Sequence, residues 1–356
     1  MKVGVVTFQE TNNYGALLQN YALSRTLRKL GASPTTIDYK SEYIGKPYRL
    51  RHLRDKGLMK YLLGVAGYII YLPRSKKNNL FRRHISYTRA VTRDELFKLN
   101  NEFDFFITGS DQVWNYNLTG SDNYYLLDFV SDKSKCASFA ASLGLTKIDK
   151  KHDKVYKDLL AGYRYLSVRE NSARDALLDI GLKDVDVVMD PCVLLSSSEW
   201  MKLADQPKEE KYVYVYQLGV SKDVVMLAKR IAREKGLKVI FTPFPVGAMY
   251  RGKMDVFAGA AQVLGYIKNA QYVITDSFHG TLLSIIFNKR FFTKASGTHA
   301  AVGSRIYDLL DHYSLTDRML DADTDYRLEI DYDRVNEILK GDRDRGLNKL
   351  KNIIDM

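Results

Sequence analysis

Short apolar runs alternate with amphipathic stretches along most of the chain, and this alternation predicts an α/β protein. The first apolar run, Lys2–Phe8, reads as a strand. A helical stretch from about 15 to 30 ends at Gly31, and a second strand follows at 35–39. The same pattern predicts further strands at 103–108, 135–140, 165–168 and 185–189, with a helix at 172–180. Strands that alternate with helices favour a parallel sheet with both faces covered.

The pattern restarts after a polar stretch at 196–211, which reads as a linker. Beyond it we expect strands at 212–217, 238–242, 272–275 and 290–293, and helices at 222–235, 259–269, 281–288 and from 331 to the end. We therefore predict an N-terminal Rossmann-like domain (1–205), a C-terminal one (206–325) and a helical tail (326–356). Ligands of open α/β sheets bind outside the carboxyl ends of the strands, so two such domains predict a cleft between those ends.

Length and composition agree with two globular domains. The chain has 356 residues, 46% of them hydrophobic. Cys136 and Cys192 have neither CxxC nor metal-site spacing and fit a reducing cytoplasm. The first apolar run is too short for a signal peptide. The formal net charge of +12 predicts an anionic partner, which could be a nucleic acid, a membrane surface or a phosphorylated substrate.

Part of this charge lies in an insertion at 41–92. The apolar run Tyr61–Leu72 is flanked by basic residues: Arg49, Arg51, Arg54, Lys56 and Lys60 before it, and Arg74, Lys76, Lys77, Arg82 and Arg83 after it. Crossing a bilayer takes about 20 residues, so this run is too short to span one. It fits either an interfacial anchor with its basic flanks on lipid head groups or a core helix with a basic rim.

Polar clusters follow several predicted strands. Asn12, Asn13 and Tyr14 precede a helix whose free N–H groups suit an anion or a sugar hydroxyl, although such residues are also ordinary in loops. Asp111, Gln112 and Trp114 suit a carbohydrate, because carboxylates and amides bond hydroxyl pairs and an indole covers a pyranose face. The alternative for this second cluster is a helix N-cap beside a buried tryptophan.

Two further clusters carry cations or a histidine. Arg169 at a strand end suits an anion clamp, or else an ion pair with Glu170. Ser277, His279 and Gly280 stand between a strand and the positive end of a helix dipole. A phosphate or carboxylate held there would favour a protonated imidazole, which is a general acid. Downstream, Lys294 and Arg305 are candidates to complete an anion pocket.

The stretches NNYGALLQNYAL, FDFFITGSDQVWN, SVRE, MDPCVLL, VITDSFHGTLLSIIFNKRFF and SRIYDLL together resemble the polysaccharide pyruvyltransferase family. Residues 41–92 and roughly the last thirty carry no such match. The resemblance implies two Rossmann-like domains facing a central cleft, as in GT-B glycosyltransferases. It also implies transfer of pyruvate from phosphoenolpyruvate to a sugar as a ketal, on a cell-surface polysaccharide or its lipid-linked precursor. The chemistry requires no metal or redox cofactor.

Carried onto this chain, the resemblance implies a role for His279 as catalytic acid or donor ligand. Arg169, Lys294 and Arg305 would bind the donor with Ser277 and Gly280, and either Asp111 or Glu170 would be the base. Some family branches have Arg where this chain has Phe278, so a donor-side cation is expected elsewhere. The acceptor side would hold Asn12, Asn13, Tyr14, Gln112 and Trp114.

We expect the N-terminal domain to bind the acceptor and the C-terminal domain to bind phosphoenolpyruvate. The acceptor would be a lipid-linked capsular or exopolysaccharide precursor, with a 4,6-ketal placed on a terminal galactose-type hexose. We expect a bacterial, cytoplasmic enzyme, peripheral at the inner face of an anionic membrane and without a nucleic-acid partner. The alternatives are a nucleotide-sugar glycosyltransferase and a non-catalytic carbohydrate- or membrane-binding protein.

Overall fold

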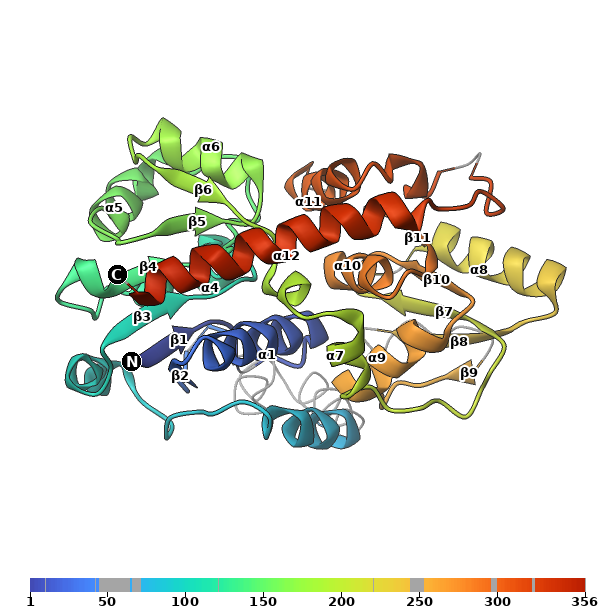
Figure 1. Cartoon of the computed structure of the whole chain (residues 1–356), viewed down its shortest axis with the longest axis horizontal. Coiled ribbons are helices and arrows are strands. Elements are labelled where there is room, and N and C mark those ends of the chain that lie inside the picture. The colour runs from blue at the N-terminus through green and yellow to red at the C-terminus, as the bar shows by residue number, and fades with distance from the viewer. Residues whose placement is uncertain are drawn as a thin grey trace. The chain divides into compact units, whose positions relative to one another are not determined.

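Strands and helices alternate in two separate parts of the chain (Figure 1). The computed structural model describes residues 1–9, 11–41, 43–44, 65, 72–120, 122–219, 221–243, 253–295, 300–321 and 324–355. Unit 1 comprises Met1–Val65, Arg82–Leu195 and Asp342–Met356, and unit 2 comprises Ala66–Phe81 and Ser196–Gly341.

Unit 1 is built on parallel strands. Its four-stranded sheet has the order β2 (Ser33–Thr36), β1 (Lys2–Val6), β3 (Phe105–Thr108), β4 (Cys136–Ser138). Strands β5 (Leu166–Val168) and β6 (Val185–Val187) form a parallel pair that continues the sheet through the bridges of Ala137 with Tyr165 and of Ala141 with Val168. The central strands β1 and β3 are apolar and buried, as expected for parallel strands covered on both faces.

Helices cover the strands of unit 1. They are α1 (Tyr14–Lys29), α4 (Tyr116–Thr119), α5 (Lys150–Leu160), α6 (Asn171–Asp179), the end of α12 (Tyr332–Asp355), and the short 3-10 helices η2 (Arg93–Asn101), η3 (Asn123–Leu126), η4 (Lys133–Lys135) and η5 (Pro191–Leu194). Leu23 and Leu27 of α1 and Leu350 and Ile353 of α12 share one buried core with Val5 of β1. The C-terminal helix thus completes the core of unit 1.

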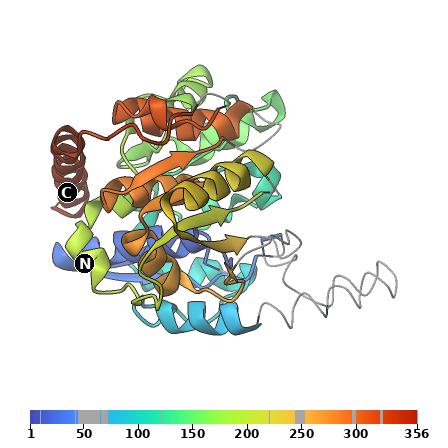
Figure 2. The same ribbon diagram turned by 90° about the vertical axis from the view of Figure 1, so that its right-hand side faces the viewer.

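Unit 2 holds a five-stranded parallel sheet (Figure 2). Its order is β11 (Arg290–Thr293), β10 (Tyr272–Thr275), β7 (Tyr212–Gln217), β8 (Lys238–Pro243), β9 (Lys253–Met254). Its helices are most of a helix at 72–82, α7 (Ser197–Met201), α8 (Lys222–Lys235), α9 (Ala260–Asn269), α10 (Phe278–Ile286), α11 (Ala300–His312), η6 (Thr316–Arg318) and the start of α12. Val224, Ala228 and Ile231 bury the apolar face of α8 against Val213 and Val215 of β7.

The structure differs from the sequence prediction in several element bounds. Helix α10 begins at Phe278 and not at Thr281. The stretch read as a linker contains α7, which Ser196 and Glu199 begin with a capping box. Residues 66–81 belong to unit 2 although they were assigned to the N-terminal domain, and the tail is divided between both units at Gly341.

The apolar run Tyr61–Leu72 lies outside the described residues except for Val65 and Leu72. In the part of the chain that the structure describes, no helix combines the length and the apolar character needed to cross a membrane.

Candidate functional site

The turn between β10 and α10 in unit 2 is held by a chain of hydrogen bonds. Thr275 Oγ1 donates to the carbonyl of Tyr216 at 2.7 Å and accepts from the N–H of Ser277 at 3.1 Å. Ser277 is the N-cap of α10, and its Oγ accepts from the N–H of Gly280 at 3.2 Å. This polar sequence therefore starts the helix at a fixed position beside the sheet.

His279 lies in the first turn of this helix. The sequence analysis placed it in the turn ahead of the helix, and the earlier start of α10 corrects that position. The side chain is buried, with 7% of its surface exposed, and its ring meets Phe278 edge-on at 5.3 Å between centroids. The first turn of a helix presents N–H groups and a positive dipole end, so an anion is favoured beside this imidazole.

Gly280 is required for packing. A Cβ at this position would lie 2.6 Å from Thr275 Oγ1 and 3.0 Å from Tyr216 Cδ1. Glycine thus lets α10 approach β10 and β7 closely. The contact of Gly280 with a donor stays a prediction.

Asp276 has a clear role that the sequence analysis did not assign. Its Oδ1 accepts from the N–H of Leu218 at 2.6 Å, and its Oδ2 accepts from the N–H of Gly219 at 2.8 Å. The carboxylate therefore fixes the loop that follows β7. The parallel pairing of β10 with β7 brings these two strand ends together, and the sequence alone did not reveal that pairing.

Lys294 begins next to the same turn. Its backbone N–H donates to the carbonyl of Thr275 at 2.9 Å, because β11 pairs with β10. Its ammonium pairs with Asp223 in the first turn of α8 and lines a cavity of about 620 Å³ that Met226 and Leu320 also line. Lys294 therefore lies at the carboxyl end of β11, next to the turn after β10, and its side chain points toward α8. Arg305 lies on α11 and is buried.

Arg169 in unit 1 forms a buried ion pair. Its Nη1 lies 3.0 Å from Asp190 Oδ2, and its Nε lies 3.6 Å from Glu170 Oε2; the side chain is 2% exposed. Ser110 Oγ also donates to Asp190 Oδ2, at 2.7 Å. Burial opposes the charged guanidinium, but the carboxylates of Glu170 and Asp190 outweigh it, and the pKa of Arg169 is raised. This arrangement agrees with the alternative of an ion pair, in which the positive charge is compensated inside unit 1. The role of Arg169 as a donor clamp stays a prediction.

Both candidate bases lie at the same edge of the sheet in unit 1. Glu170 Oε1 accepts from Ser142 Oγ at 2.6 Å and from the N–H of Gly144 at 3.2 Å. Asp111 has a φ of 82°, which is uncommon outside glycine, and its Oδ1 accepts from the N–H of Gln112 at 2.8 Å. Holding such a residue in the left-handed region costs about 1–3 kcal/mol, and such strain clusters at functional sites.

Two of the predicted acceptor residues, Trp114 and Asn13, make contacts that stabilise unit 1. Trp114 is 1% exposed, and its indole N–H donates to the carbonyl of Tyr125 at 2.9 Å. It is a core residue, which corrects the predicted stacking on a sugar, because a buried ring offers no face to a ligand. Asn13 is the N-cap of α1 and accepts from the N–H of Gly15 at 2.9 Å, while Tyr14 is buried and Asn12 is half-buried.

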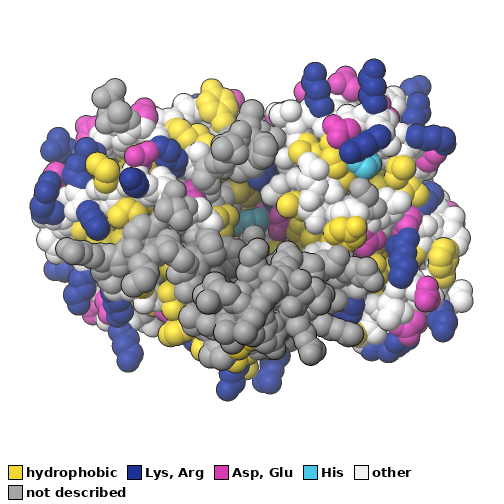
Figure 3. Space-filling view, turned by 180° about the vertical axis from the view of Figure 1, so that it is seen from behind, with side chains coloured by type: hydrophobic (Ala, Val, Ile, Leu, Met, Phe, Trp, Pro, Cys, Tyr) yellow, Lys and Arg dark blue, Asp and Glu magenta, His cyan; other side chains and the backbone are white. Residues whose placement is uncertain are grey.

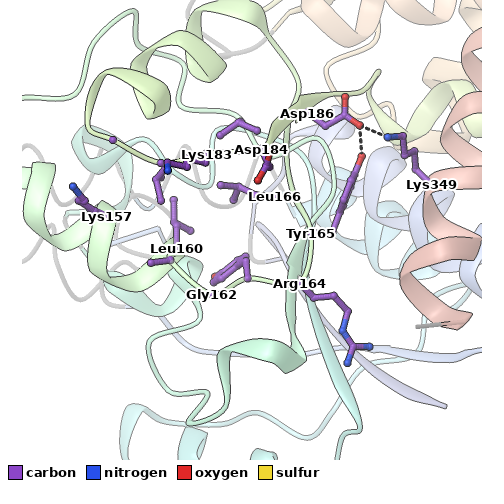
Figure 4. A pocket seen from close by; sticks show the side chains of 15 residues that line it. Lys157, Leu160, Gly162, Arg164, Tyr165, Leu166, Lys183, Asp184, Asp186 and Lys349 are labelled. Atoms are coloured by element: carbon purple, nitrogen blue, oxygen red, sulfur yellow. Dashed lines mark hydrogen bonds and ion pairs between the residues drawn. The ribbon is translucent and has the colours of Figure 1, made fainter.

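A cavity of about 740 Å³ lies at the opposite end of unit 1, beside the amino ends of β5 and β6 (Figure 4). Asp186 dominates one side of it: its Oδ2 accepts from the Tyr165 hydroxyl at 2.8 Å and pairs with Lys349 at 2.7 Å. None of the predicted site residues lines this cavity. It is therefore separate from the candidate site at the carboxyl ends of the strands.

A family model described as polysaccharide pyruvyl transferase matches residues 13–297. The chain therefore belongs to the polysaccharide pyruvyl transferase family, and this membership makes it a transferase. The predicted resemblance is confirmed.

Two solved structures are similar to the chain over nearly its whole length. The UDP-GlcNAc 2-epimerase of Methanocaldococcus jannaschii has a TM-score of 0.51 at 12% identity and covers 96% of this chain and 92% of its own. The enzyme of the same name from Neisseria meningitidis, bound to UDP-GlcNAc, has a TM-score of 0.50 at 10% identity, with coverage of 99% and 98%. At such identity the likeness shows the fold alone, and it agrees with the predicted α/β class with two Rossmann-like domains. Comparison with curated proteins gave no match.

Proposed function

We propose that this protein transfers pyruvate from phosphoenolpyruvate to a hexose of a lipid-linked capsular or exopolysaccharide precursor and releases phosphate. The product would be a 4,6-ketal on a terminal galactose-type residue. One observation carries the proposal: a member of the pyruvyl transferase family holds its SFHG histidine in the first turn of a helix that begins at the carboxyl end of a central strand.

The reaction uses an acid, a base and anion-binding groups. His279 donates a proton to the methylene carbon of phosphoenolpyruvate, and C2 becomes electrophilic. One sugar hydroxyl adds to C2 and loses its proton to Asp111 or Glu170. The C2–O bond to phosphate then breaks, and phosphate leaves with the electron pair. The second hydroxyl adds to C2, loses its proton and closes the ketal. No metal or redox cofactor takes part in this scheme.

The donor's carboxylate and phosphate need positive charge around them. We assign this role to the start of α10, with the hydroxyl of Ser277, and to Lys294 and Arg305. The ion pair of Lys294 with Asp223 is partly open to solvent, with 34% and 56% of the two side chains exposed, so the lysine is able to exchange partners. Arg169 is left out of this set, because Asp190 and Glu170 already use its charge.

We place the reaction at the cytoplasmic face of a membrane, because a lipid-linked acceptor stays in the bilayer. The protein would bind there peripherally. The anionic lipid surface is thus the proposed partner beside phosphoenolpyruvate and the acceptor, and nucleic acid is not.

Ligand-induced thermal stabilisation tests the donor. We expect phosphoenolpyruvate to raise the melting temperature of the wild type and of His279→Ala, since the anion contacts involve other groups as well. UDP-GlcNAc, the ligand bound in the Neisseria meningitidis structure, should not raise it. Stabilisation by the nucleotide sugar alone would favour a glycosyltransferase. Stabilisation by neither, together with binding of an oligosaccharide, would favour a non-catalytic carbohydrate-binding protein.

A further inference from the structure

The helix at residues 72–82 carries an unusual outer face. Leu72 and Leu80 are 44% and 51% exposed, whereas Arg74 and Asn78 between them are at most 1% exposed. Lys76 is exposed on the same side of the helix, and Arg83 is exposed in the turn that follows. Since a residue advances by about 100° in an α-helix, these four side chains fall within one stripe. We call Leu72, Lys76, Leu80 and Arg83 the outer stripe.

The inner side of this helix is firmly attached. Arg74 donates from Nε to the carbonyl of Val256 and from an Nη to the carbonyl of Pro243, both at 3.0 Å. Asn78 Oδ1 accepts from the N–H of Ala260 at 3.0 Å. These contacts fix the rotation of the helix, so the leucines of the outer stripe point away from the body of unit 2. In Figure 2 no other described element of unit 2 covers the outside of this helix (light blue).

Four of the five Lys and Arg residues at 72–83 divide into two groups, and the fifth, Lys77, is half-buried. Arg74 is buried on backbone carbonyls, and Arg82 donates to the carbonyls of Gln9 and Thr11 at 2.9 and 2.8 Å. These two cations are used inside the protein. Lys76 and Arg83 remain at the surface, and the sequence from 72 to 84 contains no Asp or Glu. The outer stripe therefore combines two aliphatic side chains with two cations and no anion.

In Figure 3 the Lys and Arg side chains of the described residues stand at many places and are interspersed with Asp and Glu, so that this face shows no single basic field. A general attraction of polyanions is therefore a poor account of the stripe. Exposed leucines beside cations match the boundary of an anionic bilayer, where apolar side chains enter the acyl region and cations stay at the head groups.

We propose that the outer stripe is the surface through which this protein docks on an anionic lipid bilayer. The uncharged run at 61–71, which precedes the helix directly in the sequence, agrees with the same environment. The inference rests on the proposed function only in that a lipid-linked acceptor requires a bilayer. The docking itself needs no catalysis, and its test uses binding alone.

The test is co-sedimentation of the full chain with vesicles of phosphatidylcholine containing phosphatidylglycerol, and with vesicles of phosphatidylcholine only. We expect binding to the anionic vesicles at low salt. Each basic residue near such a surface contributes about fivefold to the partition constant, so Lys76→Glu/Arg83→Glu should lower it by about thirtyfold or more. The matched control is Lys150→Glu/Lys151→Glu, two exposed lysines at the start of α5 that change the net charge equally. It should bind nearly as the wild type does.

Variants of the two leucines test the docking independently of charge. Leu72→Ser/Leu80→Ser should lower the binding that persists at high salt, where charge attraction is screened. Leu178→Ser is its control, since Leu178 on α6 is 44% exposed outside the stripe. All these positions are exposed, so folding should survive, and the melting temperature checks this.

Equal losses for the stripe and control variants would overturn the proposal, as would absence of wild-type binding to anionic vesicles. If vesicle binding is absent but the wild type dimerises and the stripe variants do not, the stripe is an interface between copies. A separate assay measures pyruvyl transfer to a soluble hexose acceptor that carries no lipid. Loss of docking with normal transfer in this assay leaves the proposed function standing. Normal docking without transfer contradicts the proposed function and leaves the stripe standing.

Discussion

Replacing Arg169 by methionine should strongly destabilise unit 1. The substitution keeps most of the side-chain volume but removes the guanidinium that pairs with Asp190 and Glu170. Their carboxylates, whose side chains are 0% and 2% exposed, would then be buried without their cation. Breaking a buried ion pair in this way costs about 3–5 kcal/mol, which is a large part of the stability of a typical domain.

The surroundings favour the lower end of this range. Asp190 keeps two hydrogen bonds in the variant, from Ser110 Oγ at 2.7 Å and from the N–H of Cys192 at 3.0 Å. We therefore expect a loss of about 3 kcal/mol in the free energy of unfolding. In the double variant Arg169→Met/Asp190→Asn the stranded charge on residue 190 is gone, so the cost should fall below the sum of the single costs by about 1–3 kcal/mol.

Urea denaturation followed by tryptophan fluorescence measures these energies. The chain has two tryptophans, Trp114 in unit 1 and Trp200 in unit 2, so a Trp200→Phe background leaves Trp114 as the reporter of unit 1. Arg174→Met is the matched control. Arg174 pairs with Asp175 at the surface, where 39% and 60% of the two side chains are exposed, and its removal should cost no more than about 0.5 kcal/mol.

The opposite pattern would refute this reasoning. If Arg169→Met unfolds within about 1 kcal/mol of the parent while its affinity for phosphoenolpyruvate falls, the guanidinium is a donor clamp and not a structural cation.

Three further changes test the turn and the buried thiol. Gly280→Ala should destabilise unit 2 by about 1–3 kcal/mol, read by Trp200 fluorescence, because the new Cβ would lie 2.6 Å from Thr275 Oγ1; an unchanged unfolding midpoint would show that α10 is free to shift. Ser277→Ala should cost about 1 kcal/mol through loss of the N-cap, and Ser277→Asp should recover most of it, whereas equal losses would exclude capping as the cause. Burial raises the pKa of Cys136 to about 12, so alkylation at pH 9 should be far slower in the folded protein than in urea, and equal rates would contradict the burial. The unfolded thiol ionises near pH 8.5, whereas the buried thiol stays protonated up to about pH 12. The stability that comes from burying the neutral thiol is therefore complete below pH 8.5 and is lost as the pH rises toward 12.

The sequence predicts the framework of unit 2 well because its strands are apolar and its breaks are sharp. The strands at Tyr212–Gln217, Tyr272–Thr275 and Arg290–Thr293 have the predicted bounds. The start of α10 was placed three residues late, since the polar Ser277 and His279 resemble a loop. In the structure Ser277 is the N-cap, so the polar residues begin the helix and do not precede it.

The contacts of the predicted site residues are harder to predict from the sequence. Arg169 and Asp190 are far apart along the chain, and their pairing depends on β5 and β6 being neighbours, which no local pattern reveals. The residues next to Trp114 in the sequence do not show whether its ring faces a sugar or lies in the core. The sequence analysis predicted no helix at 72–82 and read its basic residues only as a flank of the apolar run at 61–72. The buried Arg74 and the exposed Leu80 show that charge alone does not identify the outer face.

The most direct test of the account is to incubate the protein with phosphoenolpyruvate and a panel of lipid-linked hexose acceptors, and to measure the products by mass spectrometry together with phosphate release. We predict a pyruvate adduct on a galactose-type acceptor with one phosphate released for each adduct. His279→Ala, folded as judged by its melting temperature, should be slower by about a hundred- to ten-thousand-fold, as expected for loss of a general acid. No adduct with any acceptor, or near-normal phosphate release by His279→Ala, would contradict the account.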